Sequence, residues 1–469
     1  MLSLLGFATV GVILALLLTN RVAAVVALAG VPIVAALVAG FAPAEIGEFA
    51  GEGIADVAGT AAMFVFAIAF FGVLRDAGMF DPVIRRIVGF AGDSPATVCA
   101  ATTALACAAH LDGAGATTFL ITIPAMLPIF DRLGMSRLLL TTCVGLGAGV
   151  MNVLPWGGPT ARAASTSGVP ANELWVPLIP AQIAGVVVAL VIAWLLGKRE
   201  SKRIGLVQQP ATIAAGGTSA SSPSVQSPDA PADDPAGGDA AGGAAGGDAD
   251  TDGDEAGDLR RPRLFWFNVV LTVAVVGCLV AAVATPEAVF LAGLVVALIV
   301  NYPGLARQTA RIEAHAKGAM LMATTLLAAG VFLGILEASG MIEAMATTAA
   351  EAIPSGLAPA LPLVIGVLGV PLSLVFGPDA FYFGVLPVLN GVGEQFGINA
   401  ADLAQAALIG EETLGFPISP LTGAFYLLVG LAGVDIGKHI RRLLGWAWIT
   451  SLVMLAVAFA TGAIPVWAA

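Results

Sequence analysis

Residues 154–165 read LPWGGPTARAAS and residues 416–427 read FPISPLTGAFYL, so proline and other helix-weakening residues interrupt two otherwise apolar stretches. The offset that relates these stretches also superposes GVLRDAGMFD (72–81) on GILEASGMIE (334–343). Backbone groups freed inside a bilayer are tolerated only where protein or a water-filled cavity satisfies them. Interrupted hydrophobic segments at corresponding places in two halves therefore indicate the binding site of a secondary transporter.

The composition is typical of a membrane protein. The 469 residues are 58% hydrophobic and 11% charged, with a mean hydropathy of +0.94. A soluble domain could not cover so much apolar surface with so few charges. Several apolar runs approach the ~20 residues that cross a bilayer as a helix. We therefore expect an all-α polytopic membrane protein surrounded by the lipid bilayer, with no nucleic-acid partner.

Composition also divides the chain into two membrane repeats and a linker. Residues 204–259 are mostly Ala, Gly, Ser, Pro and Asp, and such a tract cannot bury enough apolar surface to fold. It is predicted to be a disordered acidic linker between repeat 1 (residues 1–203) and repeat 2 (residues 260–469). Five predicted crossings in each half give two inverted repeats of five transmembrane helices.

Each repeat is also expected to contain a re-entrant hairpin and a broken helix. The apolar stretches 95–130 and 359–393 are each interrupted near the middle by an acidic residue and glycine. This pattern predicts hairpins that enter and leave the membrane on one side. The broken helices are predicted at about 138–170 and 401–433, around the two proline-containing stretches.

The distribution of basic residues predicts the orientation. If the linker is cytoplasmic, all Lys and Arg except Arg162 fall in cytoplasmic loops, whereas the opposite loops carry glutamates. This asymmetry follows the positive-inside rule. It predicts a multi-pass protein of the plasma (inner) membrane with a cytoplasmic linker and both termini outside. Arg162 is predicted at membrane depth, where a lone cation costs at least ~2.5 kcal/mol.

An aspartate occupies each predicted hairpin tip, Asp112 in LDGAGATT and Asp379 in GPDAFYF. The glycines that follow Asp112 allow close backbone approach, and the next helix offers free N–H groups to an anion. An aspartate before a helix is also an ordinary cap, so this structural interpretation stays open. The matching positions of the two acids favour a functional pair.

The predicted substrate site combines glycines, hydroxyls, an amide and one guanidinium from the tips and breaks. Half-helix N-termini favour carboxylates, while unwound carbonyls favour cations. Arg162 fits a carboxylate bidentately, although it could instead pair structurally with Asp112 or Glu411. The candidate substrate-binding residues are Gly113, Gly115, Thr117, Thr118, Asn152, Gly157, Gly158, Thr160, Arg162, Gly377, Ser419 and Thr422.

Two adjacent glutamates, Glu411 and Glu412, precede the second break. If the crossing starts near Ala401, one of them turns toward the bundle interior, where burial favours the protonated form. They are the candidates for proton coupling, and a solvated helix entrance is the alternative. His110, close to Asp112, could also carry a proton, but a hydrogen-bonded packing histidine is favoured.

The motifs at these positions resemble the citrate–divalent metal:proton symporter family, CitMHS, of the ion transporter superfamily. The resemblance is densest in LDGAGATTFLITIPAMLP, GVMNVLPWGGPTARAAS, FGPDAFYFGVLPVL and FPISPLTGAFYLLVGLAGVDIGKHIRR. It implies import of citrate complexed with Mg²⁺ or Ca²⁺ together with protons. Superfamily relatives also imply a homodimer and elevator-type alternating access. Sodium-coupled relatives carry Ser-Asn-Thr at the hairpin tips, so the acidic tips here argue against their sodium sites.

The residues and the resemblance together predict a secondary active transporter that imports a citrate–metal complex by proton symport. Asp112 and Asp379 would reach the metal, which is a co-substrate and not a permanently bound cofactor. A sodium-coupled di- or tricarboxylate transporter or an organic-anion exchanger is the alternative. A membrane enzyme is disfavoured because the three histidines lack H-E-x-x-H or a similar spacing.

Overall fold

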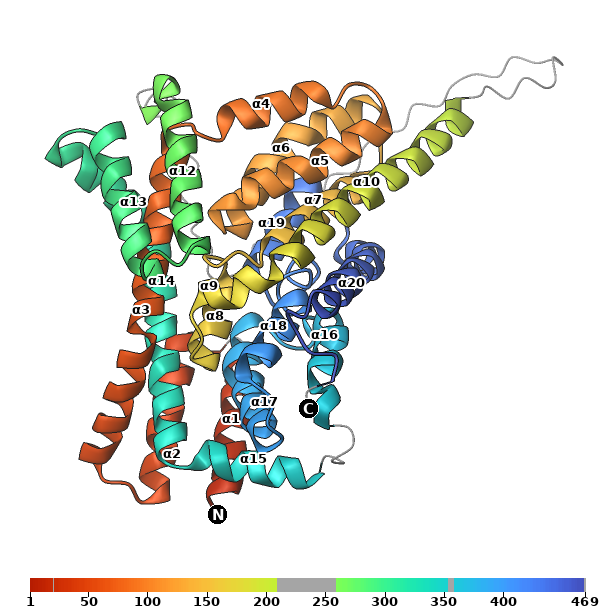
Figure 1. The fold of residues 1–469 in the computed structure, drawn as a ribbon. Helices are drawn as coiled ribbons and strands as arrows, with labels where there is room; N and C mark the ends of the chain where they lie inside the picture. Colours follow the sequence, from red (N-terminus) through yellow and green to blue (C-terminus); the bar gives the residue numbers. More distant parts are fainter. Residues whose placement is uncertain (20, 209–258, 353–357, 468–469) are drawn as a thin grey trace, which may run out of the picture.

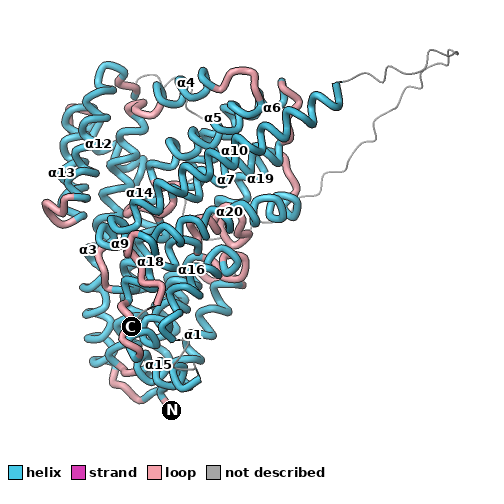
Figure 2. The backbone as a smooth tube through the Cα atoms, turned by 45° about the vertical axis from the view of Figure 1, so that its right-hand side comes forward, coloured by secondary structure: helices cyan, strands magenta, loops and turns pink. Residues whose placement is uncertain are grey.

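The computed structural model describes residues 1–19, 21–208, 259–352 and 358–467. These ranges form helices joined by loops and contain no strand (Figures 1 and 2). The expected all-α fold is therefore confirmed. Within the described ranges, the helices long and apolar enough to cross a membrane span Pro43–Asp76, Ala171–Ile204, Pro262–Val280, Leu305–Ala338 and Ile436–Ala460.

The two halves present their helices in a similar order. The first half contains α1 (Leu2–Leu18), η1 (Val26–Gly30), α2 (Val31–Ala39), α3 (Pro43–Asp76), α4 (Asp81–Phe90), α5 (Pro95–Ala109), η2 (His110–Asp112), α6 (Gly115–Arg132), α7 (Arg137–Met151), α8 (Gly158–Ser167), α9 (Ala171–Trp175), η3 (Val176–Leu178) and α10 (Ile179–Gln208). The second contains η4 (Pro262–Leu264), α12 (Phe265–Val280), α13 (Pro286–Asn301), α14 (Leu305–Ala338), α15 (Met341–Ala352), η5 (Ala358–Ala360), α16 (Leu361–Leu372), η6 (Ala380–Val385), α17 (Leu386–Gln395), α18 (Ala400–Gly410), α19 (Gly423–Ala432) and α20 (Ile436–Ala460). The orientation of the halves relative to a membrane stays a prediction.

The longest helices, α3 and α14, pack against each other and run in opposite directions (Figure 1). Glycines form their crossing. A Cβ atom on Gly53 would clash with the carbonyl group of Gly330, and one on Gly334 would clash with the carbonyl oxygen of Phe49. Small residues allow the backbones of membrane helices to approach closely and to gain van der Waals contact. The sequence places these glycines where the two helices touch.

Valine in place of Gly330 should destabilise the protein, because its side chain has no room between the backbones of α3 and α14. Overpacking costs about 1–3 kcal/mol and sometimes more. Thermal unfolding in detergent should show a lower Tm. The control is Gly51→Val on α3, where an added Cβ meets no heavy atom within 4 Å. Equal Tm values for the two variants would contradict a stabilising role of the crossing.

The segments predicted as hairpins and broken helices each contain two helices. In the first half, α5 and α6 meet at η2, and in the second half α16 and α17 lie on either side of η6. The apolar stretch of α7 ends at Met151 and continues as α8 from Gly158, while α18 ends at Gly410 and α19 begins at Gly423. Of the prolines in these stretches, Pro155, Pro417 and Pro420 lie in the non-helical residues, and Pro159 is the second residue of α8. These four turns and breaks lie at the centre of the molecule and supply its candidate site.

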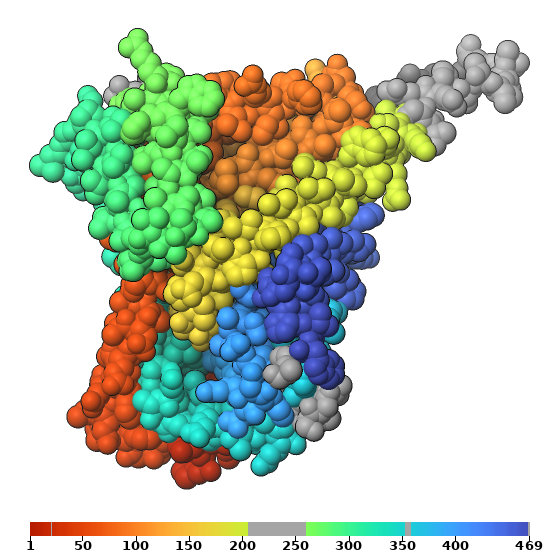
Figure 3. Space-filling view, in the orientation of Figure 1, coloured from red at the N-terminus to blue at the C-terminus, as the bar shows by residue number. Residues whose placement is uncertain are grey.

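The predicted linker lies almost entirely outside the described residues. On one side of it, α10 runs diagonally across the surface, packed on α5 and α20 (Figures 1 and 3). On the other side, the second half resumes at Leu259, whose carbonyl accepts a hydrogen bond from the Tyr302 hydroxyl at 2.9 Å. Figure 1 places the end of α10 and the start of α12 on opposite sides of the molecule.

A Gly-Ser segment of equal length in place of residues 211–254 should leave transport near the wild-type rate, because the native tract has almost no large apolar side chain with which to pack. Composition alone predicts that simple deletion is tolerated as well. After a deletion, the few linker residues that remain would have to join the end of α10 to the start of α12 across the molecule. Each residue spans at most ~3.3–3.6 Å, so we expect the deletion to be tolerated less well than the length-matched replacement. Uptake assays of well-inserted variants test both forms. Loss of transport in the length-matched replacement would show that the native linker sequence has a working role.

Candidate functional site

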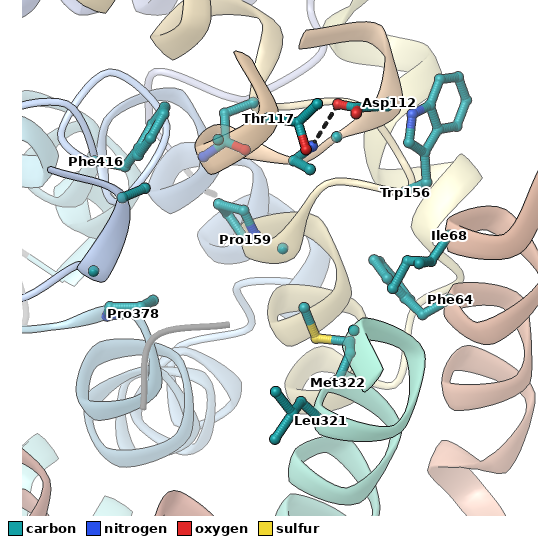
Figure 4. A pocket seen from close by; sticks show the side chains of 18 of the residues that line it. Phe64, Ile68, Asp112, Thr117, Trp156, Pro159, Leu321, Met322, Pro378 and Phe416 are labelled. Atoms are coloured by element: carbon teal, nitrogen blue, oxygen red, sulfur yellow. Dashed lines mark hydrogen bonds between the residues drawn. The ribbon is translucent and has the colours of Figure 1, made fainter. Parts of the chain in front are cut away.

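A cavity of about 500 Å³ lies between the α3–α14 pair and the hairpin tips and breaks. In Figure 4, Asp112 and Thr117 lie on one side of it, and Leu321 and Met322 of α14 lie on the other. The α3–α14 wall consists of Phe64, Ile68, Phe71, Gly72, Arg75, His315, Lys317, Gly318, Leu321, Met322 and Thr325. The remaining lining comes from Asp112, Gly113, Ala114, Gly115, Thr117, Asn152, Trp156, Gly158, Pro159, Arg162, Pro378, Asp379, Glu412, Phe416, Thr422, Gly423 and Ala424.

The first hairpin tip brings a carboxylate into the cavity. Asp112 ends the short helix η2, and Gly113 then adopts a positive φ of 75° with its Cα close to the backbone of Trp156. One carboxylate oxygen of Asp112, Oδ1, accepts a hydrogen bond from the backbone N–H of Ala114 at 2.9 Å. This bond lies in the turn before α6, whose N-cap residue is Ala114 and which has no side-chain cap hydrogen bond, so capping does not account for Asp112. Its second oxygen, Oδ2, faces another partner.

That partner is Arg75, from the last turn of α3. Its Nη1 donates to Asp112 Oδ2 at 3.3 Å and to Thr117 Oγ1 at 3.0 Å. The charge pattern assigned Arg75 to a cytoplasmic loop, whereas the structure places it in the cavity wall. Arg75 lies in the last turn of α3, and the side of the membrane that this end of the helix faces stays a prediction. Arg162 is therefore not the sole cation of the site.

Arg162 follows the first break and lies in the second turn of α8, where it lines the cavity. Its Nε donates to Asp379 Oδ1 at 2.6 Å, and the side chains of Arg162 and Asp379 are 8% and 14% exposed. Neither structural partner considered from the sequence, Asp112 or Glu411, pairs with Arg162; Asp379 does. Asp379 precedes η6 without making a side-chain cap hydrogen bond, so the capping interpretation does not account for it.

The second break separates the two adjacent glutamates. Glu412 has a positive φ of 53° and lines the cavity, whereas Glu411 turns away and accepts a hydrogen bond from Ser373 Oγ at 3.2 Å. Both side chains are buried, at 0% and 1% exposure, and each leaves its Oε1 without a hydrogen-bond partner. The solvated-entrance alternative is wrong for both glutamates.

His110 belongs to a buried network behind the hairpin tip. Its Nδ1 bonds to Thr118 Oγ1 at 2.8 Å and its Nε2 to Asn152 Oδ1 at 3.1 Å. The amide nitrogen of Asn152 donates to the backbone carbonyl of Glu412 at 2.7 Å. His110 thus joins the first tip to both breaks, as the favoured packing interpretation expects, and it does not line the cavity.

The cavity gathers most, but not all, of the residues predicted for the site. Those in its lining are Asp112, Gly113, Gly115, Thr117, Asn152, Gly158, Arg162, Asp379, Glu412 and Thr422. Among the others, Thr160 Oγ1 donates to the carbonyl of Val153 at 3.1 Å and so supports the backbone of the first break. These residues outside the lining are Thr118, Gly157, Thr160, Gly377, Glu411 and Ser419. Sequence reasoning missed the contributions of α3 and α14, above all Arg75, His315 and Lys317.

Three helices begin at the cavity, and their first residues, Gly115, Gly158 and Gly423, line it. Helix N-termini present free N–H groups that stabilise anions. Among the residues that the structure describes, no group of three or more His, Cys, Asp or Glu side chains could hold a metal ion. A metal at Asp112 or Asp379 would therefore need further oxygen ligands from the molecule that arrives with it.

The sequence of this chain is similar to those of known transporters. The family model CitMHS, described as citrate transporter, matches residues 6–410. A "Citrate transporter" of Bacillus subtilis is 39% identical over 99% of this chain and 100% of its own length. A "Mg(2+)/citrate complex secondary transporter" of the same organism is 36% identical over 99% of this chain and 100% of its own length.

A solved structure shares the fold. The YdaH transporter of Alcanivorax borkumensis superposes with a TM-score of 0.54, covering 90% of this chain and 88% of that chain at 15% sequence identity. At this identity the likeness concerns the arrangement of helices alone. It shows that a similar overall fold occurs in a solved structure.

Proposed function

Because the chain belongs to the CitMHS family of citrate transporters, we propose that this multi-pass membrane protein imports citrate as its complex with a divalent metal, Mg²⁺ or Ca²⁺, by proton symport. The family consists of transporters and not enzymes, as the sequence predicted. The relative named as a Mg²⁺/citrate complex transporter supports the metal complex as substrate. The proposal rests on the observation that two Arg–Asp pairs and three helix N-termini converge on one cavity.

The charges of the cavity suit such a substrate. Citrate³⁻ with a divalent metal carries one negative charge, which lowers the cost of placing it inside a membrane. The lining holds the cations Arg75, Arg162 and Lys317 and the carboxylates Asp112, Asp379 and Glu412, so it is neutral when all are ionised. A proton on Glu412 would make the lining positive by one charge, equal and opposite to the charge of the complex. Proton binding and substrate binding would then support each other.

Within this proposal the predicted residues have separate tasks. Asp112 and Asp379 would reach the metal, for which carboxylates are suitable ligands. Arg162 and the N-termini of α6, α8 and α19 would hold the remaining carboxylates of citrate. Both glutamates have an unpartnered oxygen, but Glu412 is the preferred proton carrier because it faces the cavity and Glu411 does not.

Alternating access would follow the elevator mode that the superfamily resemblance implies. The hairpins and broken helices would move together against the α3–α14 pair, in a homodimer in the plasma membrane with its linker in the cytoplasm. The cavity lies between these two groups of helices, and both groups contribute charged residues to its lining. This arrangement supports a movement of one group against the other. A sodium-coupled carboxylate carrier and an organic-anion exchanger are the competing functions.

Proteoliposomes with labelled citrate test the proposal directly. Uptake should require Mg²⁺ or Ca²⁺ and an inwardly directed proton gradient, and a chelator should stop it. Uptake driven by a sodium gradient, or only by citrate loaded inside the vesicles, would favour the competing functions.

Glu412→Gln should abolish uptake driven by a proton gradient and retain exchange of citrate–metal complex across the membrane, because the neutral amide imitates the loaded, protonated carboxyl. Glu411→Gln is the matched control, since Glu411 is equally buried but outside the cavity, and it should keep proton-driven uptake. Reversed phenotypes would assign the coupling proton to Glu411.

A further inference from the structure

We propose that Arg75 is a second substrate-binding guanidinium, and that the two Arg–Asp pairs of the cavity select the metal–citrate complex over free citrate and over free metal. The inference rests on the proposed function and extends it to a specificity mechanism. Both carboxylates predicted to reach the metal already pair with a guanidinium group: Asp112 with Arg75 and Asp379 with Arg162.

Both arginines retain binding capacity toward the cavity. Arg75 uses Nη1 for Asp112 and Thr117, while Arg162 uses Nε for Asp379. The structure shows no other hydrogen bond from either guanidinium to the described residues. Since a guanidinium has five N–H donors in a planar fork, each arginine can keep its aspartate and still offer donors to a carboxylate in the cavity.

Arg75 is not needed to join α3 to its neighbour α14. The neighbouring carboxylate, Asp76, is occupied, because its Oδ2 accepts hydrogen bonds from His315 Nε2 at 2.9 Å and from Arg311 Nη1 at 3.1 Å. These contacts join α3 to α14 without Arg75. The Arg75 side chain instead reaches the first hairpin tip and remains 33% exposed, whereas Asp112 is 6% exposed.

The two pairs disfavour either component alone. Free citrate could bind the guanidinium groups, but its carboxylates would then lie close to Asp112 and Asp379. Like charges repel at close range, so this repulsion would weaken its binding. A free divalent metal would gain the aspartates but would face Arg75 and Arg162. In a metal–citrate complex, the metal can lie between an aspartate and a citrate carboxylate while that carboxylate also contacts the arginine. Every charge then has a neighbour of opposite sign.

Reciprocal changes in ligand preference test the inference. Binding to the purified full-length protein is measured by calorimetry with three probes: Mg²⁺ alone, citrate with a chelator, and citrate with Mg²⁺. Wild-type protein should bind only the complex well. Arg75→Gln should bind the complex at least tenfold more weakly and gain affinity for Mg²⁺ alone, since Asp112 loses its cation. Asp112→Asn should gain affinity for citrate without metal, since Arg75 loses its anion.

Three further variants make the outcome decisive. The double variant Arg75→Gln with Asp112→Asn should show neither gain in affinity. Arg75→Lys should not gain Mg²⁺ binding, because it keeps the positive charge. The surface variant Arg137→Gln should bind all three probes as the wild type does. If the single variants lose the complex without either reciprocal gain, the selection mechanism is wrong. If the wild type itself does not bind citrate with Mg²⁺, the proposed function fails instead. Should Arg75→Gln not fold, the Asp112→Asn result decides alone.

Discussion

Asp112→Asn and Asp379→Asn should each reduce Mg²⁺-dependent citrate uptake to background while the protein still inserts into the membrane. An amide has nearly the shape of the carboxylate but lacks the charge that attracts the metal. It also leaves Arg75 or Arg162 without its anionic partner at 3.3 or 2.6 Å. Arg162 is 8% exposed, so the loss of Asp379 leaves a buried uncompensated charge, which costs about 3–5 kcal/mol. Arg75 is 33% exposed, so the loss of Asp112 costs less stability. Uptake of labelled citrate in proteoliposomes, with insertion checked separately, measures the effect.

The control is Asp93→Asn, which removes a carboxylate of the same type from an exposed pair. Asp93 lies 2.8 Å from Arg132, and their side chains are 81% and 64% exposed. Exposed pairs contribute little, with a median of about 0–1 kcal/mol, so this variant should transport at the wild-type rate. Wild-type uptake by both cavity variants as well would remove the metal role and leave the two aspartates as structural partners of Arg75 and Arg162.

Arg162→Lys should weaken binding of the citrate–metal complex strongly and leave the empty protein nearly as stable as wild type. An ammonium group keeps the charge, so it still balances Asp379, but it cannot reproduce a planar fork that serves Asp379 and the substrate at once. Loss of a hydrogen bond to a charged group costs about 1.5–3 kcal/mol, which corresponds to a roughly ten- to hundredfold higher Kd.

Thermal shift separates this role from a structural one. Ligand present at a hundred times its Kd stabilises a protein by about 2.7 kcal/mol, so wild type should gain stability from citrate with Mg²⁺, and the Lys variant should gain little. Arg137→Lys is the control, because Arg137 forms a two-point pair with Asp131 on the surface, at 3.0 and 2.8 Å. A variant that unfolds readily when empty yet shows the full ligand-induced gain would contradict substrate contact by Arg162.

Local patterns were enough to locate most of the site. Clustered proline and glycine weaken an α-helix, so the breaks before Gly158 and Gly423 could be predicted from the sequence, although single prolines such as Pro124 and Pro128 lie inside α6. Acidic residues beside glycine in apolar stretches likewise marked the tips that carry Asp112 and Asp379. These features depend only on the residue and its immediate neighbours. The repeat offset then predicted that the tips and breaks act together.

The partners of these residues depend on contacts between distant helices. Arg162 and Asp379 meet from opposite halves of the chain, and Arg75, which the charge pattern assigned to a loop, meets Asp112 from the last turn of α3. No periodicity in the sequence specifies which of several cations a buried carboxylate will face.

The choice between the two glutamates depended on the backbone in the same way. Glu411 and Glu412 are adjacent and chemically alike, but the positive φ of Glu412 turns one side chain into the cavity and leaves the other against Ser373. A non-glycine residue adopts that conformation only where the surrounding packing holds it. Secondary structure and the location of the site therefore follow from local chemistry, whereas ion pairing and the direction of each buried acid follow from the way the helices pack.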